Sequence, residues 1–226
     1  MERTALDNRH IPEKPSIRRP AVFFDRDGTL VDEVEYLSAL DQIIIKPGVA
    51  RALAALRNRG FLAVVVTNQS GVARGLFTAE FVNNCHDLIQ QRLRRQGAQI
   101  DGFYFCPHHP EGVVPTFARS CQCRKPGPGL LIKASQDLCI DIAESWMVGD
   151  KIADIQAGLG AGCRTILVRT GYGRETEVNS SEDLRISGTA VVDDVVAGVK
   201  HILEHSPSDG TLKHTREESS CRFEGV

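Results

Sequence analysis

The chain has 226 residues, 42% of them hydrophobic and 25% charged, and its formal net charge is −2. This balance is typical of a globular protein with a sizeable core, and it excludes the strong positive field of a nucleic-acid binder. No apolar run approaches the roughly 20 residues of a membrane helix. Residues 1–20 are polar and contain prolines, without the apolar core of a signal peptide. We therefore expect a cytoplasmic monomer with no nucleic-acid or membrane partner.

Short apolar runs alternate with helical patterns along most of the chain. The expected strands are residues 21–25, 61–66, 102–105, 145–150, 165–168 and 190–192. The expected helices are residues 47–60, 78–96, 128–138, 151–160 and a short one that ends near 203. Such alternation predicts an α/β fold with a doubly wound, mostly parallel sheet. We expect a flexible arm at 1–20, one domain at 21–204 and a disordered, polar tail at 205–226.

The first apolar run ends in two carboxylates, Asp25 and Asp27, followed by Gly28. Open α/β sheets bind ligands just beyond the carboxyl ends of their strands, where these side chains would lie. Two carboxylates this close repel each other, and a hard cation such as Mg²⁺ would relieve the repulsion. One carboxylate would then attack a phosphorus atom while the other moves a proton. A strand followed by an ordinary Asp-Gly turn explains this stretch alone equally well.

Polar residues also follow two further strands, with Thr67 and Asn68 after the second and Asp150 after the fourth. Parallel neighbours would gather these ends at one edge, and Lys125, just before a helix, can reach it. The set suits phosphoryl transfer through an aspartyl-phosphate, in which a cation and Lys125 neutralise the phosphoryl oxygens. Taken singly, each of these residues also has an ordinary structural explanation. Thr67 and Asn68 are explained as a turn, Asp150 and Asp154 as acids at a helix N-terminus, and Lys125 as a solvated surface charge.

Seven cysteines, an odd number, argue against a disulfide framework. Residues 106–126 follow no helical or strand period and contain Cys106, His108, Cys121 and Cys123, a set suited to tetrahedral Zn²⁺. The one-residue gaps are tighter than those of zinc fingers, so spacing alone leaves buried thiols, or His109 as the histidine ligand, as alternatives. The other four are expected to be free thiols: Cys85, Cys139, Cys163 and Cys221.

Five motifs together resemble the D-glycero-D-manno-heptose 1,7-bisphosphate 7-phosphatase family of the haloacid-dehalogenase (HAD) superfamily, over about residues 20–200. They are Asp-Arg-Asp-Gly-Thr at 25–29, Thr-Asn-Gln-Ser-Gly-Val-Ala-Arg-Gly at 67–75, Cys-Pro-His-His-Pro at 106–110, Cys-Gln-Cys-Arg-Lys-Pro at 121–126 and Met-Val-Gly-Asp-Lys at 147–151. The histidinol-phosphate phosphatases are nearly as similar. The resemblance implies that 21–204 is a HAD-like phosphatase domain of Rossmannoid topology, with no large cap and a zinc-bound loop insertion.

The resemblance also implies catalytic and metal-binding roles. Asp25 would be the nucleophile, and Asp27 would protonate the leaving oxygen and then activate water. Thr67 and Lys125 would stabilise the phosphoryl group. Asp25, Asp150 and the backbone carbonyl of Asp27 would hold Mg²⁺.

Further implied roles concern the substrate and the zinc loop. The expected substrate contacts are Arg26, Glu33, Tyr36, Asn68, Gln69, Ser70, Arg124 and Lys151. The resemblance favours His108 over His109 as the zinc ligand. A Cys3His set fills all four zinc positions, so this zinc would be structural and would turn Arg124 and Lys125 toward the phosphates. Asp154 would support the site without contacting substrate.

The expected function is Mg²⁺-dependent removal of the C7 phosphate of D-glycero-D-manno-heptose 1,7-bisphosphate, in nucleotide-activated heptose synthesis. A site without a large cap suits a small phosphorylated sugar better than a protein substrate. Residues 33–36, Glu-Val-Glu-Tyr, stand where the best-known members have a glycine-containing loop with shorter side chains, which leaves the sugar and its anomer open. The alternatives are a histidinol-phosphate phosphatase and a zinc-stabilised binding module that has lost catalysis.

Overall fold

The computed structural model describes residues 18–37 and 39–206. Most of the predicted tail, and most of the predicted arm, therefore lie outside the described residues. The first strand begins at Arg19, before the expected residue 21, and the last helix ends at His205. None of the helices in the described part of the chain is long and apolar enough to cross a membrane.

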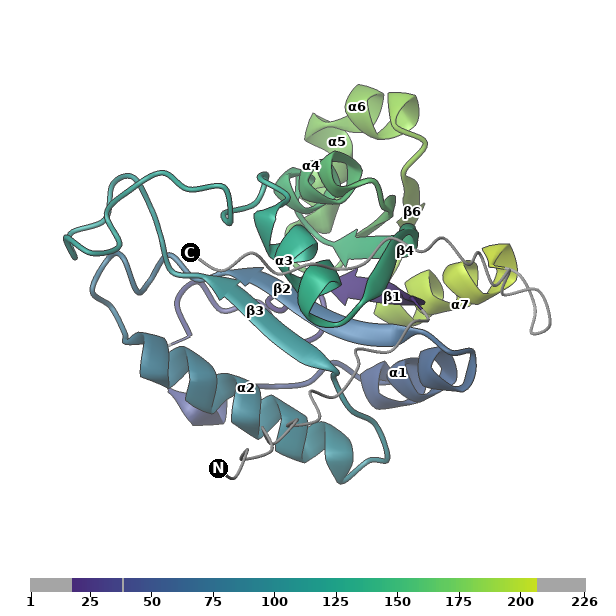
Figure 1. The fold of residues 1–226 in the computed structure, drawn as a ribbon, viewed down its shortest axis with the longest axis horizontal. Helices are drawn as coiled ribbons and strands as arrows, with labels where there is room; N and C mark the ends of the chain where they lie inside the picture. The colour runs from purple at the N-terminus through teal and green to yellow at the C-terminus, as the bar shows by residue number, and fades with distance from the viewer. Residues whose placement is uncertain (1–17, 38, 207–226) are drawn as a thin grey trace, which may run out of the picture.

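Six parallel strands form one sheet in the order β3-β2-β1-β4-β5-β6 (Figure 1). Their bounds are Arg19–Phe24 (β1), Leu62–Asn68 (β2), Gly102–Cys106 (β3), Ile140–Gly149 (β4), Arg164–Val168 (β5) and Ala190–Val192 (β6). The order reverses direction at β1, which pairs with β2 on one side and β4 on the other. This is the doubly wound topology that the alternation of elements predicted, and it confirms the fold class.

Helices cover both faces of the sheet (Figure 1). Their bounds are Leu40–Gln42 (η1, a 3-10 turn), Val49–Asn58 (α1), Ala79–Arg94 (α2), Gly129–Asp137 (α3), Ile152–Ala161 (α4), Gly173–Asn179 (α5), Ser181–Ile186 (α6) and Val195–His205 (α7). Side chains of β1 alternate between two cores, as a pleated strand requires. Val22 and Phe24 pack with α1, α2 and α7, whereas Ala21 and Phe23 pack with α3 and α4.

Three elements were not expected from the sequence: η1, α5 and α6. Each is short and lacks an apolar stripe, since α6 buries only Leu184 and α5 only Gly173. The strand β4 also begins at Ile140, earlier than the expected residue 145. Its first residues pair with Arg19 and Pro20, and a register shift separates this pairing from the main one.

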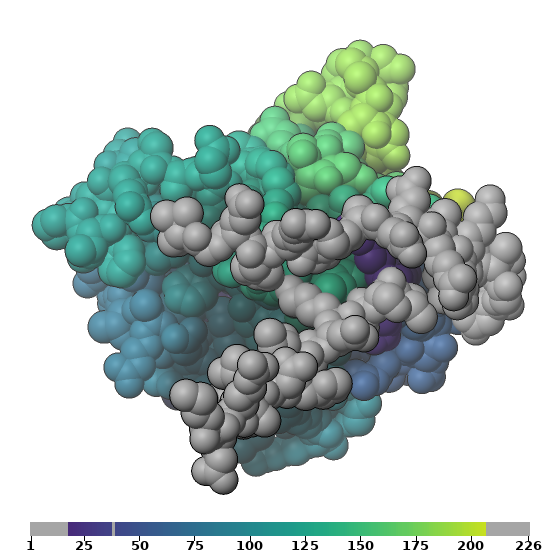
Figure 2. All heavy atoms as spheres, viewed as in Figure 1, coloured from purple at the N-terminus to yellow at the C-terminus, as the bar shows by residue number. Residues whose placement is uncertain are grey.

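The strand register places the polar residues that follow each strand at one edge of the sheet. Asp25 follows β1, Thr67 and Asn68 end β2, and Asp150 follows β4. Asn68 in turn pairs with Cys106 at the end of β3, from which the loop 107–122 leaves the sheet. This loop (teal) and the α5–α6 segment (light green) project as two separate lobes in Figure 2.

His86 of α2 is buried without charge beside β3. Its ring stacks on Phe103 with 4.7 Å between ring centroids. Burial, and secondarily the positive charge of Arg26, lower the pKa of His86 to about 3. An unfolded histidine has a pKa near 6.5, so the unfolded chain takes up this proton first as the pH falls. The stability that depends on neutral His86 is therefore present above about pH 6.5 and is lost progressively below it.

We predict that acidification from pH 7 to pH 5 costs up to about 2 kcal/mol through His86. Urea denaturation at both pH values should show a smaller loss for His86→Phe, which keeps a ring on Phe103 but cannot take up a proton. His205→Phe, at an exposed position of α7, is the control and should retain the pH dependence of the unmodified protein. Equal losses in the His86→Phe and unmodified proteins would contradict this assignment.

Candidate active site

Three buried carboxylates meet at the carboxyl edge of the sheet. Asp25 follows β1, Asp150 follows β4, and Asp154 lies in the first turn of α4. They are 5%, 0% and 1% exposed, and one oxygen of each lies within 4.8 Å of the others. Burial, and then the charges of Asp25 and Asp154, raise the pKa of Asp150 to about 8. This concentration of negative charge requires positive partners.

Lys125 supplies one positive charge from within the protein. Its Nζ lies 2.8 Å from Oδ1 of Asp25 and 2.6 Å from Oδ1 of Asp154, and it donates a hydrogen bond to the carbonyl of Val66. Burial disfavours the charged ammonium, but the attraction of Asp154 and Asp25 outweighs it and raises the pKa of Lys125. The lysine is therefore a permanent cation that bridges two carboxylates.

Asn68 fixes the backbone of Lys125. Its Nδ2 donates to the carbonyl of Lys125 over 2.9 Å, and its Oδ1 accepts from the Lys125 amide over 3.0 Å. These two bonds attach the segment after the cysteines to the end of β2. Both polar atoms of the Asn68 side chain, which was predicted to contact substrate, therefore bind the protein backbone.

Asp154 contributes more than the sequence indicated. It was expected only to support the site, yet its Oδ1 pairs directly with Lys125. Its Oδ2 accepts from the amide of Lys151 over 3.0 Å, which caps the start of α4. An acid in the first turn of a helix is common, so local sequence alone could not distinguish this residue from an ordinary cap.

The turn after β5 completes the surroundings of Asp150. The amide of Tyr172 donates to Oδ2 of Asp150 over 2.8 Å, whereas Oδ1 is buried and has no partner among the described residues. Gly28 and Gly171 approach the same carboxylate with positive φ angles of 80° and 56°. A side chain at either position would overlap Oδ2 of Asp150. These contacts were not predicted, and the Gly-Tyr-Gly turn at 171–173 was their only signal.

Asp27 lies outside the group of three carboxylates. Its two oxygens accept from Nε and Nη2 of Arg26 over 3.0 and 2.9 Å, and Oδ2 also accepts from Nε2 of Gln69 over 2.9 Å. The same Nε2 donates to Oγ1 of Thr67. The guanidinium of Arg26, which was predicted to contact substrate, is instead buried and paired with Asp27.

The remaining predicted substrate contacts lie on the segments that follow β1, β2, β3 and β4. Nζ of Lys151 lies 3.4 Å from Oε2 of Glu33 and 4.4 Å from the ring centroid of Tyr172. Tyr36 is 39% exposed on the loop after β1, and Ser70 is half-buried on the loop after β2. The guanidinium of Arg124 is half-buried and donates to the carbonyl of His108 over 3.3 Å.

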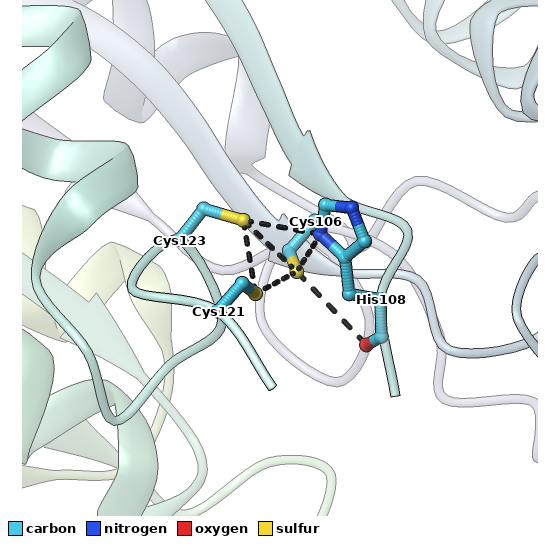
Figure 3. Close-up of side chains that lie close together, drawn as sticks. All are labelled: Cys106, His108, Cys121 and Cys123. Atoms are coloured by element: carbon cyan, nitrogen blue, oxygen red, sulfur yellow. Dashed lines mark hydrogen bonds between the residues drawn. The ribbon is translucent and has the colours of Figure 1, made fainter. Parts of the chain in front are cut away.

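Cys106, His108, Cys121 and Cys123 converge on one point between β3 and the following loop (Figure 3). The three sulfurs are 3.1–3.5 Å apart, and Nδ1 of His108 lies 3.4 Å from Cys123 and 3.6 Å from Cys106. Sulfurs around a tetrahedral zinc ion lie about 3.8 Å apart, so the group is close to this arrangement. It is a Cys3His group able to hold a metal ion.

His109 does not belong to this group. Its Nε2 lies 3.3 Å from Nη2 of Arg74, and its Nδ1 accepts from the amide of Glu111. The choice between the two histidines that spacing left open therefore falls on His108. The remaining described cysteines, Cys85, Cys139 and Cys163, are free thiols, and Cys221 lies outside the described residues.

Comparison with known proteins gives consistent likenesses. A HAD-hydrolase-like family model matches residues 122–197. The D-glycero-beta-D-manno-heptose-1,7-bisphosphate 7-phosphatase of Yersinia pestis is 45% identical over 172 residues, 76% of this chain and 92% of that protein. The Escherichia coli K12 enzyme of the same name is 42% identical over 172 residues, 76% of this chain and 90% of that protein.

Among solved structures, the D,D-heptose 1,7-bisphosphate phosphatase of B. bronchiseptica, complexed with magnesium and phosphate, is 34% identical with a TM-score of 0.73. The match covers 83% of this chain and 99% of that chain. The parallel sheet, the carboxylates at its edge and these likenesses define a HAD-type phosphatase, a phosphoric monoester hydrolase. Within that class, the chain belongs to the D-glycero-beta-D-manno-heptose-1,7-bisphosphate 7-phosphatase family.

We predict that Lys125→Met lowers the free energy of unfolding by about 3 kcal/mol, because Asp25 and Asp154 lose their buried cation. The measurement is urea denaturation without added Mg²⁺. Adding Asp154→Asn to this variant should recover part of the loss. Lys133→Met, which removes an exposed pair with Asp137, is the control and should change stability by less than about 0.5 kcal/mol. A similar small change for Lys125→Met would show that the buried pair is not needed for folding.

Proposed function

We propose that this protein hydrolyses the C7 phosphate of D-glycero-β-D-manno-heptose 1,7-bisphosphate, releasing the heptose 1-phosphate and inorganic phosphate. The reaction is a step in the synthesis of nucleotide-activated heptose. The observation that carries this proposal is 40–45% identity to three bacterial phosphatases named for this β-anomer substrate, each covered over at least 90% of its length. The structure contributes a matching set of reactive groups.

The proposed reaction has two displacements at phosphorus. In the first, a carboxylate oxygen of Asp25 bonds to phosphorus, the bond from phosphorus to the sugar oxygen breaks, and Asp27 gives its proton to that oxygen. In the second, Asp27 takes a proton from water, the water oxygen bonds to phosphorus, and the bond to Asp25 breaks. The ammonium of Lys125, 2.8 Å from Asp25, neutralises charge on the phosphoryl oxygens, and Thr67 positions them.

The carboxylate group fits a magnesium ion. Its donors are oxygens, which Mg²⁺ prefers, and Oδ1 of Asp150 is buried without a partner among the described residues. The B. bronchiseptica relative is described as a complex with magnesium and phosphate. We expect Asp25, Asp150 and the backbone carbonyl of Asp27 to hold the ion. When bound, it would offset charge on the phosphoryl oxygens.

The Cys3His group fits zinc in a structural role. Three thiolates and one imidazole fill a tetrahedral shell and leave no position for water or substrate. The loop between the ligands, 109–120, contains no helix or strand, so the ion would supply order that backbone pairing does not. Arg124 and Lys125 directly follow the last ligand, and their placement is what zinc would secure.

The substrate assignment is tested by phosphate release with Mg²⁺ from four compounds. They are the β and α anomers of heptose 1,7-bisphosphate, fructose 1,6-bisphosphate and histidinol phosphate. We predict a kcat/KM for the β anomer at least about tenfold above the others, a difference of roughly 1.4 kcal/mol in transition-state stabilisation. A preference for the α anomer or for histidinol phosphate would keep the mechanism and reject the substrate. No release from any of the four would reject the function in favour of a binding module.

The zinc assignment predicts one zinc ion per chain in the purified protein, measured by elemental analysis. Cys121→Ser combined with Cys123→Ser should abolish zinc binding, increase proteolysis within 107–122 and lower kcat, because Lys125 loses its support. Cys139→Ser, at a free thiol outside the group, is the control. Full activity in a zinc-free double variant would contradict a supporting role for the metal.

A further inference from the structure

The carboxylate of Asp27 is held in one orientation by two neighbouring side chains. Nε and Nη2 of Arg26 contact its two oxygens in the bidentate arrangement, over 3.0 and 2.9 Å. Nε2 of Gln69 adds a third bond over 2.9 Å. A bidentate guanidinium fixes the plane of a carboxylate as well as its distance, which a single hydrogen bond does not do.

Arg26 makes this contact from inside the protein. Its side chain is only 3% exposed. Nη1 has no hydrogen-bond partner among the described residues. A buried guanidinium with an unsatisfied N–H costs free energy, and its pairing with Asp27 compensates part of that cost.

Gln69 connects Asp27 to the phosphoryl-binding residues. The amide nitrogen that donates to Asp27 also donates to Oγ1 of Thr67 over 2.9 Å. The backbone of Gln69 is itself anchored, because its N–H donates to the carbonyl of Cys106 over 2.8 Å. One amide group thus sets the spacing between the side chain that moves the proton and the one that orients the phosphoryl group.

We propose that Arg26 and Gln69 are positioning residues, which hold Asp27 where it can give a proton to the leaving oxygen. This differs from the substrate contacts expected of both residues, and it rests on the proposed two-step reaction. In that step the proton of Asp27 moves to the oxygen whose bond to phosphorus breaks. Neither Arg26 nor Gln69 gains or loses a proton.

Leaving-group dependence separates this role from a general structural one. A sugar alkoxide needs the proton as the phosphorus–oxygen bond breaks, whereas p-nitrophenolate leaves readily without it. The experiment measures the first-turnover rate of leaving-group release, with enzyme in excess and Mg²⁺ present. Because only release of the leaving group is followed, hydrolysis of the phosphoenzyme does not contribute to the rate. The two substrates compared are heptose 1,7-bisphosphate and p-nitrophenyl phosphate.

For Arg26→Met and Gln69→Leu we expect the rate with the sugar bisphosphate to fall about 10- to 100-fold, with less than a threefold fall for p-nitrophenyl phosphate. The KM for the sugar, measured separately at steady state, should change little. Arg26→Lys, which retains the charge but not the bidentate contact, should give an intermediate loss. Arg57→Met, which removes an exposed arginine paired with Asp101, is the control.

Equal losses with both compounds, or a raised KM with an unchanged rate, would overturn the proposal. Gln69→Leu keeps the test decisive if Arg26→Met fails to fold. If the protein does not accept the heptose substrate, the same comparison is made with whichever alkyl phosphate it hydrolyses. Failure of the substrate assignment is thereby distinguishable from failure of the positioning role.

Discussion

The ion pairs of buried Lys125 with Asp25 and Asp154 are the interaction on which the rest of the site depends. Three carboxylates at one sheet edge repel each other in a setting where water cannot screen them. One ammonium, fully desolvated and held by two carboxylates and the carbonyl of Val66, offsets part of that repulsion. The carboxylates still outnumber the ammonium, and burial together with the charges of Asp25 and Asp154 raises the pKa of Asp150. This excess of negative charge makes the site suited to a divalent cation.

This lysine belongs to a loop rather than to the sheet, so its position must be imposed by other contacts. The doubly wound order places β2 and β3 beside each other, and β3 ends at Cys106. The Cys3His group brings the two ends of the loop after β3 together. Asn68 binds the backbone of Lys125 to the end of β2 through two hydrogen bonds. The loop that carries the Cys3His group and the end of β2 thus position Lys125 from two directions.

The doubly wound parallel sheet, the edge of the sheet that carries the site and the Cys3His group were predictable, because apolar runs, turn residues and cysteine spacing are local signals. The direct contact of Asp154 with Lys125, the approach of Gly28 and Gly171 to Asp150, and the burial of Arg26 behind Asp27 were not. Each depends on how segments far apart in the sequence meet, which local patterns do not encode. The short helices α5 and α6 were missed for a related reason, since they bury too little apolar surface to produce a helical period.

We expect phosphoryl transfer to pass through Asp25. The direct measurement is peptide mapping of acid-quenched Asp27→Asn protein after mixing with p-nitrophenyl phosphate and Mg²⁺. This leaving group needs no proton from Asp27, and loss of the base should leave the phosphoenzyme undischarged. We predict phosphate on the peptide that contains Asp25, at Asp25 itself, and none when Asp25→Asn is added. Phosphate on another residue, or product formed with no phosphorylated peptide, would contradict the account.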